Sequence, residues 1–340
     1  MEIAALEKTA RQLVAPGKGI LAADESTGTL NKRFDEAGIP ATPENRRAYR
    51  EMLFSAPGLG EFISGVILFD ETIRQKDRAG TLFVDVLQRQ GILPGIKVDT
   101  GAHSLAGFPG EKVTEGLDGL RDRLSSYSAM GARFAKWRAV IEIGPDRPSH
   151  TCLAANAHAL ARYAALCQES GIVPIVEPEV LMTGAHSFQR HFEVTRSILI
   201  LVFQQLFEHR VHLGGMLLKP NMVLPGEASR ESASVEEVAA YTRRCLNECV
   251  PSAVPGIVFL SGGQSETDTT KHLNALNGQG ATPWTLSFSF GRALQEQALK
   301  TWRGKEENTA SAQAILRHRA SCNAAALTGS YTTAMEGPSR

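Results

Sequence analysis

The 340-residue sequence predicts an α/β fold, a single (β/α)8 TIM barrel over residues 1–340. Two observations lead to this prediction. Short apolar runs alternate with helical stretches at spacings of roughly 30 to 45 residues, which is typical of βα units that form a parallel sheet. Eight such runs can be counted, and eight strands close this type of barrel. The length alone would also allow two domains, so the repeated βα pattern decides the prediction.

Each of the eight runs is apolar, short and bounded by glycine, proline or polar residues, which favours a buried strand. The sixth run lies between a glycine pair and Pro220 and is too short for a buried helix. In chain order, the predicted strands are residues 19–23, 66–69, 95–98, 134–137, 173–176, 216–218, 256–260 and 286–289.

The segments between the runs carry signals for helix ends. Thr42 and Pro43 suit the N-cap and first position of a helix. Ser234 and Glu237 have the spacing of a capping box. Gly171 follows an alanine- and leucine-rich stretch and suits a helix C-cap.

Both ends of the chain lie outside the βα pattern. Residues 1–15 predict an extra N-terminal helix that lies across the barrel before its first strand. A last helix is expected over about 307–328, ending at Gly329. Residues 330–340 are polar and have no periodicity, so they predict a flexible C-terminal tail.

The composition argues against several classes of protein. The chain has 36 basic and 36 acidic residues, and this zero net charge gives no reason to expect a nucleic acid or membrane partner. The five cysteines are far apart and include no CxxC pair, which argues for a reducing compartment. No leader pattern or apolar run of membrane-spanning length is present, so we expect a cytoplasmic protein.

The predicted barrel mouth is rich in charge. Active sites of such barrels lie at the C-terminal ends of the strands, where the strand ends converge. Any one charged residue there could belong to an ion pair across the barrel top, but their joint placement predicts an active site. The charged or hydroxyl residues at these ends are Asp24, Glu25, Asp70, Lys97, Asp99, Lys136, Arg138, Glu177, Glu179, Lys219, Ser261 and Arg292.

Lys219 is the candidate nucleophile. It ends an apolar strand, where burial penalises the charged ammonium and a second cation would penalise it further. A neutral amine can attack a ketone or aldehyde, and the resulting iminium accepts electrons as an adjacent carbon–carbon bond breaks or forms. The alternative is a lysine whose amine reaches solvent, which is common for lysines at strand ends.

Three further residues suit acid–base work. Glu177 lies on the neighbouring strand, where an apolar wall would raise its pKa towards neutrality. Lys136 and Arg138 alternate about Trp137, so a strand directs both towards the barrel interior. Lys136 could protonate a departing hydroxyl, and Asp24 could orient or deprotonate a substrate hydroxyl.

Two groups of residues suit anions. Residues 261–264 and 289–292 follow the last two strands with glycine-rich turns, a helix start and one arginine, and barrels commonly bind phosphate at these loops. Lys32, Arg33 and Lys97 could bind a second anion at the opposite rim. One phosphate on each side of a reactive amine describes an open-chain sugar bisphosphate.

No metal and no organic cofactor is expected. The sequence contains nine histidines but no HExxH motif, and the pairs His186/His191 and His209/His212 lie in or beside a long predicted helix, away from the mouth. No Walker motif and no GxGxxG after a strand is present.

Seven motifs together resemble the class I, Schiff-base fructose-1,6-bisphosphate aldolases over essentially the whole chain. They are residues 19–28, 95–99, 134–138, 174–179, 217–222, 259–264 and 287–292. The resemblance implies that Lys219 forms the imine and that Glu177 is the principal acid and base, with Asp24, Lys136 and Glu179 beside it. It assigns the C1 phosphate to Ser261, Gly262, Ser289, Gly291 and Arg292, and the other end of the substrate to Arg33, Lys97 and Arg138.

The same resemblance implies reversible cleavage of fructose 1,6-bisphosphate to dihydroxyacetone phosphate and glyceraldehyde 3-phosphate, in glycolysis and gluconeogenesis. It also implies a cytosolic homotetramer. The chain departs from the family pattern at several positions. It has no tyrosine after Tyr331, Phe290 replaces a common tyrosine, Thr29 a common serine and Thr100 a common lysine.

These departures leave the substrate open. Sedoheptulose 1,7-bisphosphate and fructose 1-phosphate are alternatives that use the same chemistry. A sugar-phosphate-binding scaffold protein is an alternative of a different class. The joint presence of Lys219, Glu177 and Lys136 argues against the scaffold, because binding alone needs only cations and glycine turns.

Overall fold

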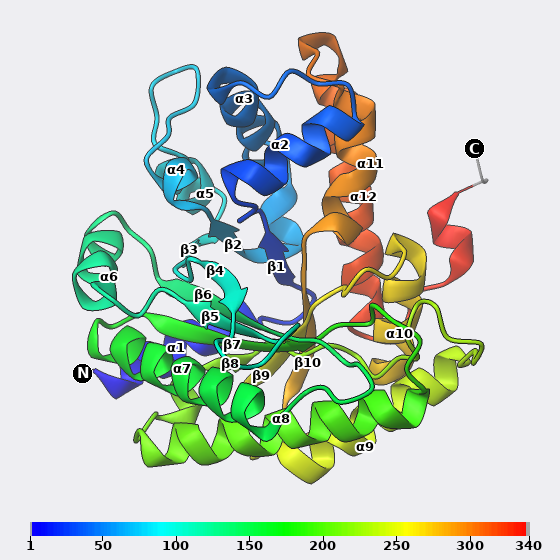
Figure 1. The fold of residues 1–340 in the computed structure, drawn as a ribbon. Coiled ribbons are helices and arrows are strands. Elements are labelled where there is room, and N and C mark those ends of the chain that lie inside the picture. Colours follow the sequence, from blue (N-terminus) through cyan, green and yellow to red (C-terminus); the bar gives the residue numbers. More distant parts are fainter. Residues whose placement is uncertain (1, 338–340) are drawn as a thin grey trace.

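The computed structural model describes residues 2–337 and contains a closed barrel of eight parallel strands (Figure 1). Around the barrel the strand order is β1-β10-β9-β8-β7-β6-β3-β2, which confirms the predicted (β/α)8 fold. The barrel strands are β1 (Gly19–Ala22), β2 (Ile63–Leu68), β3 (Leu93–Lys97), β6 (Phe134–Ile141), β7 (Val173–Val180), β8 (Leu217–Leu218), β9 (Gly256–Phe259) and β10 (Thr285–Phe290).

Helices surround the barrel and connect successive strands. The predicted caps form: Thr42 accepts a hydrogen bond from the Asn45 backbone, and Ser234 and Glu237 make a full capping box. The helices are α1 (Ile3–Leu13), α2 (Thr27–Glu36), α3 (Pro43–Phe54), α4 (Asp70–Ile73), α5 (Phe83–Arg89), α6 (Leu120–Ala129), α7 (His150–Glu169), α8 (Phe188–Glu208), α9 (Val235–Cys249), α10 (Glu266–Gly278), α11 (Arg292–Trp302) and α12 (Thr309–Ala326). None of these helices is long and apolar enough to cross a bilayer.

The N-terminal helix α1 closes the base of the barrel. Its apolar face packs against interior residues of the strands in one cluster that includes Leu6, Leu13, Ile20 and Val258. The approach is close, because a Cβ on Gly65 of β2 would lie 2.8 Å from a Leu13 methyl group. Glycine is therefore needed at that position, and α1 covers the N-terminal ends of the strands, opposite the cavity at their C-terminal ends.

The sequence did not predict two insertions near the mouth. An antiparallel hairpin of β4 (Gly101–Ser104) and β5 (Lys112–Glu115) follows β3, and α2 precedes the predicted helix α3 between β1 and β2. Asp70, expected at the mouth, instead begins α4 and binds Arg74 and Tyr127. It is absent from the residues that line the cavity.

The segment predicted as a flexible C-terminal tail includes a short helical element. Residues 333–336 form a short 3-10 helix, η4 (Thr333–Glu336). Tyr331 is buried, and its hydroxyl donates to Glu336, which also pairs with Arg319 of α12. These contacts hold residues 331–336 against the barrel, because a buried aromatic ring and an ion pair anchor them. Residues 338–340, the end of the predicted tail, lie outside the described residues.

Candidate active site

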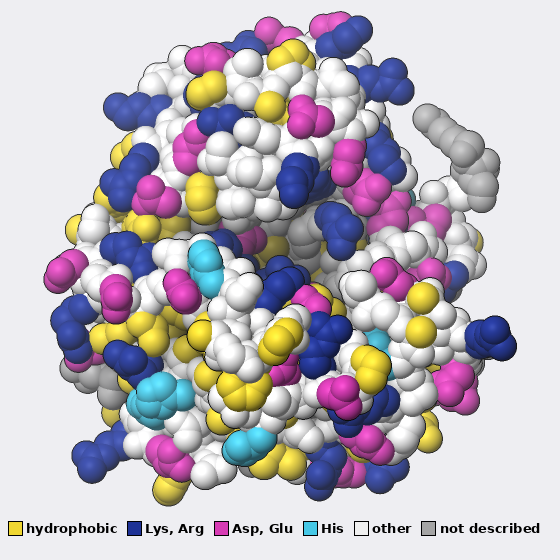
Figure 2. Space-filling model, viewed as in Figure 1, with side chains coloured by type: hydrophobic (Ala, Val, Ile, Leu, Met, Phe, Trp, Pro, Cys, Tyr) yellow, Lys and Arg dark blue, Asp and Glu magenta, His cyan; other side chains and the backbone are white. Residues whose placement is uncertain are grey.

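The barrel mouth contains a cavity of about 710 Å³. Figure 2 shows it as a hollow near the centre of one face, with lysine and arginine side chains gathered around it. All the residues predicted for catalysis and substrate binding line this cavity: Asp24, Arg33, Lys97, Lys136, Arg138, Glu177, Glu179, Lys219, Ser261, Gly262, Ser289, Gly291 and Arg292.

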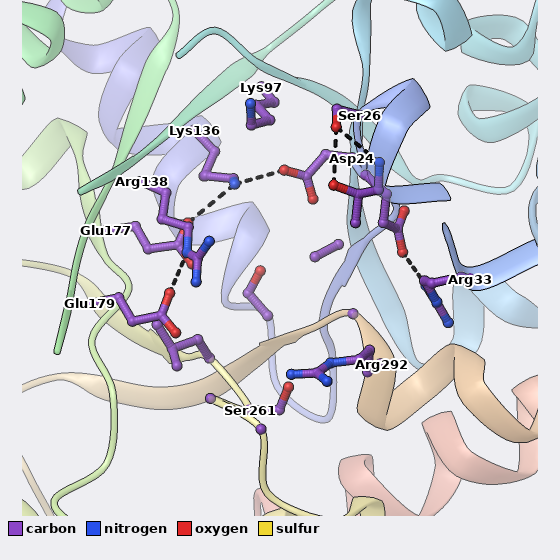
Figure 3. A pocket seen from close by; sticks show the side chains of 18 of the residues that line it. Asp24, Ser26, Arg33, Lys97, Lys136, Arg138, Glu177, Glu179, Ser261 and Arg292 are labelled. Atoms are coloured by element: carbon purple, nitrogen blue, oxygen red, sulfur yellow. Dashed lines mark hydrogen bonds and ion pairs between the residues drawn. The ribbon is translucent and has the colours of Figure 1, made fainter. Parts of the chain in front are cut away.

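Four buried charged groups form a chain across the bottom of the cavity. Lys136 Nζ lies 2.7 Å from Asp24 Oδ2 and 3.3 Å from Glu177 Oε2. Lys219 Nζ lies 3.2 Å from the other oxygen of Glu177. Each side chain comes from or directly follows a different strand, namely β1, β6, β7 and β8. The barrel therefore brings together two carboxylates and two amines that are far apart in the sequence, and Figure 3 shows Lys136 between Asp24 and Glu177.

Strand geometry explains why these side chains meet. Residues 134, 136 and 138 of β6 alternate with Trp137, which packs outwards against Tyr163 of α7. Glu177 and Glu179 of β7 face the interior in the same way, and Arg138 lies beside Glu177 in the strand register. Both strands extend three or more residues beyond the predicted ends, so these residues lie within strands.

The pKa of Glu177 is lowered, whereas the sequence predicted that it would be raised. Burial does raise it, but the positive charges of Lys136 and Lys219 outweigh burial. The prediction was wrong because it considered an apolar wall and not the two adjacent amines. Glu177 is therefore a carboxylate in the ligand-free site, poised to accept a proton.

The other end of the buried chain is also ionised. Burial raises the pKa of Asp24, but the positive charges of Lys136 and Lys219 lower it by more, so the pKa is about 2. Burial lowers the pKa of Lys136, but Asp24 and Glu177 raise it above its usual value. Lys136 is therefore a protonated amine that can donate hydrogen bonds, or a proton, to a ligand above it.

One rim of the cavity carries cations that already have carboxylate partners. Lys97 Nζ lies 2.7 Å from Asp99 Oδ1, and the other Asp99 oxygen accepts the Arg138 backbone N–H. The Arg138 guanidinium pairs with Glu179. These contacts fix the directions of Lys97 and Arg138 before a ligand arrives.

A second group of partnered cations lies beside helix α2. Glu25 pairs with Arg33 at 2.5 Å and with the buried Arg50 of α3 at 2.8 Å. Sequence reasoning missed Arg50. The available signal was its place on the apolar face of α3, next to Tyr49 and close to Leu53, because a charge on a buried face needs a partner.

The opposite rim is built from glycine turns and a single arginine. Gly262 and Gly263 follow β9 with φ values of 61° and 91°, which non-glycine residues adopt with strain. A Cβ on Gly263 would lie 3.7 Å from Arg292 Nη2, so the guanidinium lies beside this turn. In the described residues Arg292 has no ion-pair partner, and the buried Ser289 hydroxyl has no hydrogen-bond partner. An anion would satisfy both groups.

Gln295 is a further buried residue that sequence reasoning missed. Its amide donates to the Ala22 carbonyl at 2.6 Å and accepts from the Tyr49 hydroxyl at 2.9 Å. Gln295 therefore ties the first turn of α11, which carries Arg292, to the end of β1, which carries Asp24. No sequence motif marks such a role for a single glutamine in a helix.

Comparison with known proteins connects this geometry to a family. A family model described as class-I fructose-bisphosphate aldolase matches residues 5–340. The chain belongs to the class-I fructose-bisphosphate aldolase family. The family assignment confirms the resemblance, and with it a lyase that cleaves fructose 1,6-bisphosphate. The roles of the individual site residues remain predictions.

Aldolases from bacteria, plants and a parasite are similar to the chain. A probable class 1 fructose-bisphosphate aldolase of Xanthomonas campestris pv. campestris is 57% identical over 332 residues, which cover 97% of this chain and 99% of that protein. Cytosolic fructose-bisphosphate aldolase 4 of Arabidopsis thaliana is 54% identical over 317 residues, covering 93% and 81%. The aldolase of Plasmodium falciparum, solved with TRAP and a small-molecule inhibitor, has a TM-score of 0.96 and 48% identity, covering 97% of this chain and 96% of that chain.

The departures from other aldolases fall at different distances from the cavity. Phe290 is fully buried, packs on Phe288 and is absent from the cavity lining. Thr29 does line the cavity, where its hydroxyl lies 3.0 Å from that of Ser26. Of these two positions, only Thr29 can change a group that a substrate meets.

Proposed function

We propose that Lys219 forms a Schiff base with the C2 keto carbon of fructose 1,6-bisphosphate. The observation that supports this most strongly is the position of its amine, 3% exposed at the bottom of the cavity and 3.2 Å from Glu177. Glu177 is a carboxylate there, so it can take a proton from the ammonium as the neutral amine attacks. The product of attack is a carbinolamine.

Loss of the carbinolamine hydroxyl as water requires a proton, and two groups can supply it. Glu177 carries the proton taken from Lys219, and Lys136 lies on the far side of the same carboxylate. The nitrogen lone pair then forms the iminium as the carbon–oxygen bond breaks. In this scheme Lys136 also offsets the negative charge of Glu177 and Asp24.

Cleavage begins when a carboxylate removes the proton of the C4 hydroxyl. Asp24 suits this step, because its low pKa keeps it ionised and because Lys136 Nζ, 2.7 Å from Asp24 Oδ2, holds the carboxylate in position. The C3–C4 bond electrons move into the iminium, which releases glyceraldehyde 3-phosphate and leaves an enamine. Protonation of the enamine at C3, followed by hydrolysis of the imine, releases dihydroxyacetone phosphate and regenerates Lys219.

The two phosphates would bind to different kinds of groups. In this proposal the C1 phosphate binds the Gly262–Gly263 turn, Ser289, Gly291 and Arg292, and among the described residues no carboxylate forms an ion pair with Arg292. The other phosphate binds near Arg33, Lys97 and Arg138, whose charges are shared with Glu25, Asp99 and Glu179. This asymmetry favours fructose 1-phosphate as a second substrate, because the phosphate it retains meets the unpaired arginine.

We also propose a cytoplasmic homotetramer. Several relatives are named cytosolic or cytoplasmic aldolases. On α8, Phe207 is 83% exposed and Ile200 is 41% exposed, seven residues apart on one helix face. An apolar ring this exposed suits a contact between subunits. Replacing Phe207→Asp should shift the sedimentation coefficient towards a smaller species, and an unchanged value would contradict a contact through α8.

Borohydride trapping tests the central proposal. The chain is incubated with dihydroxyacetone phosphate and reduced, and the modified peptide is identified by mass spectrometry. A reduced adduct on Lys219 is expected. An adduct on Lys136 would reassign the nucleophile, and no adduct, together with activity that requires a divalent metal, would replace the Schiff-base mechanism.

A further inference from the structure

We propose that His318, Cys322 and Glu336 bind a thiophilic divalent cation of the zinc class, at a site separate from the active site. His318 and Cys322 belong to α12, and Glu336 ends η4 in the C-terminal segment. One donor atom from each side chain lies within 4.8 Å of the other two. This is a set of nitrogen, sulfur and oxygen donors that zinc and cobalt prefer.

The helix geometry suits a shared ion. His318 and Cys322 are four residues apart, so both project from the same face of α12. Their donor atoms, Nε2 and Sγ, are 3.7 Å apart. In a tetrahedral zinc site with ordinary bond lengths, a nitrogen and a sulfur ligand are roughly 3.6 Å apart. These two ligands therefore need almost no movement to bind one ion, and the Glu336 carboxylate needs a small adjustment.

The carboxylate is held in place by two neighbours. The Tyr331 hydroxyl donates to Glu336 Oε1 at 2.7 Å, and the Arg319 guanidinium pairs with Oε2. Hydrogen-bonded carboxylates are the rule at metal sites, because outer partners orient the ligand. Each oxygen keeps a second lone pair for an ion. His318 is exposed and Cys322 is fully buried, so the ion would enter from the His318 side.

The charges around the three ligands can accommodate a cation. Arg319 pairs with Glu336 and donates to the Glu266 backbone carbonyl, so two acidic residues lie around one guanidinium. One Glu266 oxygen is also buried without a hydrogen-bond partner among the described residues. With the Cys322 thiolate, three negative charges balance Arg319 and a divalent ion.

Binding includes one proton transfer. A metal-bound cysteine is a thiolate, so its thiol must lose a proton. The thiol proton passes to solvent as the sulfur–metal bond forms. None of the three ligands lines the active-site cavity. The bound ion would join η4 to α12, and its role would be to anchor the C-terminal segment rather than to take part in catalysis.

Cobalt titration of the untagged full-length chain tests the proposal. A near-ultraviolet thiolate-to-cobalt band and visible bands of a tetrahedral ion are expected, saturating at one ion per chain and displaced by zinc. His318→Ala and Cys322→Ser should each weaken binding at least tenfold. Cys249→Ser is the matched control, because Cys249 is a half-exposed thiol on α9 outside the cluster, and this variant should bind as the parent does.

Thermal unfolding gives a second measurement. Zinc at a hundredfold excess over its Kd should raise Tm by about 4 °C in the parent and leave His318→Ala unchanged. Aldolase activity should be the same with zinc or chelator. His318 is exposed, so its replacement should not prevent folding. If Cys322→Ser unfolds, the result for His318→Ala decides whether the metal site exists. Absence of the thiolate band at one equivalent, or its persistence in His318→Ala, would show that Cys322 and Glu336 serve packing and ion pairing alone.

Discussion

The polar and charged groups on the two sides of the barrel mouth differ in whether they have interaction partners. In one group, on or after β1, β6, β7 and β8, the buried charges Asp24, Lys136, Glu177 and Lys219 form a chain of contacts. On the side of β9 and β10, Arg292 has no ion-pair partner in the described chain and the Ser289 hydroxyl is buried without a hydrogen bond. We call these the paired side and the open side (Figure 3).

The difference separates chemistry from binding. Asp24, Lys136 and Glu177 keep one another ionised, so they are in position and charged before substrate arrives. Groups on the open side lack such partners among the described residues, and in the proposed function the phosphate completes their interactions. Substitutions on the paired side should therefore affect both turnover and folding. Substitutions on the open side should affect substrate binding and leave folding intact or improved.

The largest expected effect is at Lys219. Replacing Lys219→Ala removes the nucleophile and should lower kcat by roughly 10⁴-fold or more. Inorganic phosphate should bind as in the parent, because the open side is untouched, and equilibrium dialysis or calorimetry measures this. Turnover close to that of the parent would remove Lys219 from the mechanism, and lost phosphate binding would show that the two sides are not separate.

The second prediction concerns Arg292. Replacing Arg292→Ala should raise KM for fructose 1,6-bisphosphate by roughly 30- to 100-fold, because charge-assisted hydrogen bonds to phosphate are lost. The Tm should not fall, since the guanidinium has no ion-pair partner in the described residues. Arg33→Ala is the comparison, and its Tm should fall because Glu25 loses one of its two cations. Equal losses of Tm in the two variants would contradict the distinction between cations with and without a carboxylate partner.

A third prediction uses the buried Ser289 hydroxyl. Replacing Ser289→Ala should weaken substrate binding about 10-fold, as expected for the loss of one hydrogen bond to a charged phosphate. The free energy of unfolding should rise by up to about 1 kcal/mol, because a buried unpaired hydroxyl is removed. Urea denaturation measures the second quantity. A loss of stability would mean that the hydroxyl has a partner in solution.

The last prediction concerns pH. The folded-state pKa of Asp24 is lowered from 3.8 to about 2, so Asp24 stabilises the fold above its unfolded pKa and loses this contribution as pH falls from about 4 to 2. The contribution at neutral pH is about 2 kcal/mol. In the Asp24→Asn variant, the urea unfolding midpoint should change less with pH over this acid range. A parent midpoint that does not fall there would show that Asp24 is unpaired.

The sequence predicted the positions of the site residues better than their electrostatics. The alternation in residues 134–138 and 174–179 was enough to direct Lys136 and Glu177 inwards, because side-chain direction follows strand period. The direction of the Glu177 pKa shift depends on distances to Lys136 and Lys219, which come from three different strands. A pattern within one strand contains no such distances.

Insertions and supporting contacts were also beyond sequence reasoning. Asp70 follows a barrel strand as the catalytic residues do, but α4 begins at that residue and directs it to Arg74. The ion pair between Glu25 and Arg50 joins residues 25 positions apart on different elements. Only the folded chain shows which of several charged residues near a strand end meet.

The helix across the base of the barrel has a consequence for how the reaction ends. In the proposed mechanism, the described residues of α1 close that end, so a solvent proton would reach the enamine through the opening by which the aldehyde leaves. The aldehyde must therefore leave through this opening before a proton from the medium can enter by the same route. Exchange of tritium from dihydroxyacetone phosphate into the solvent should slow when an aldehyde occupies that opening.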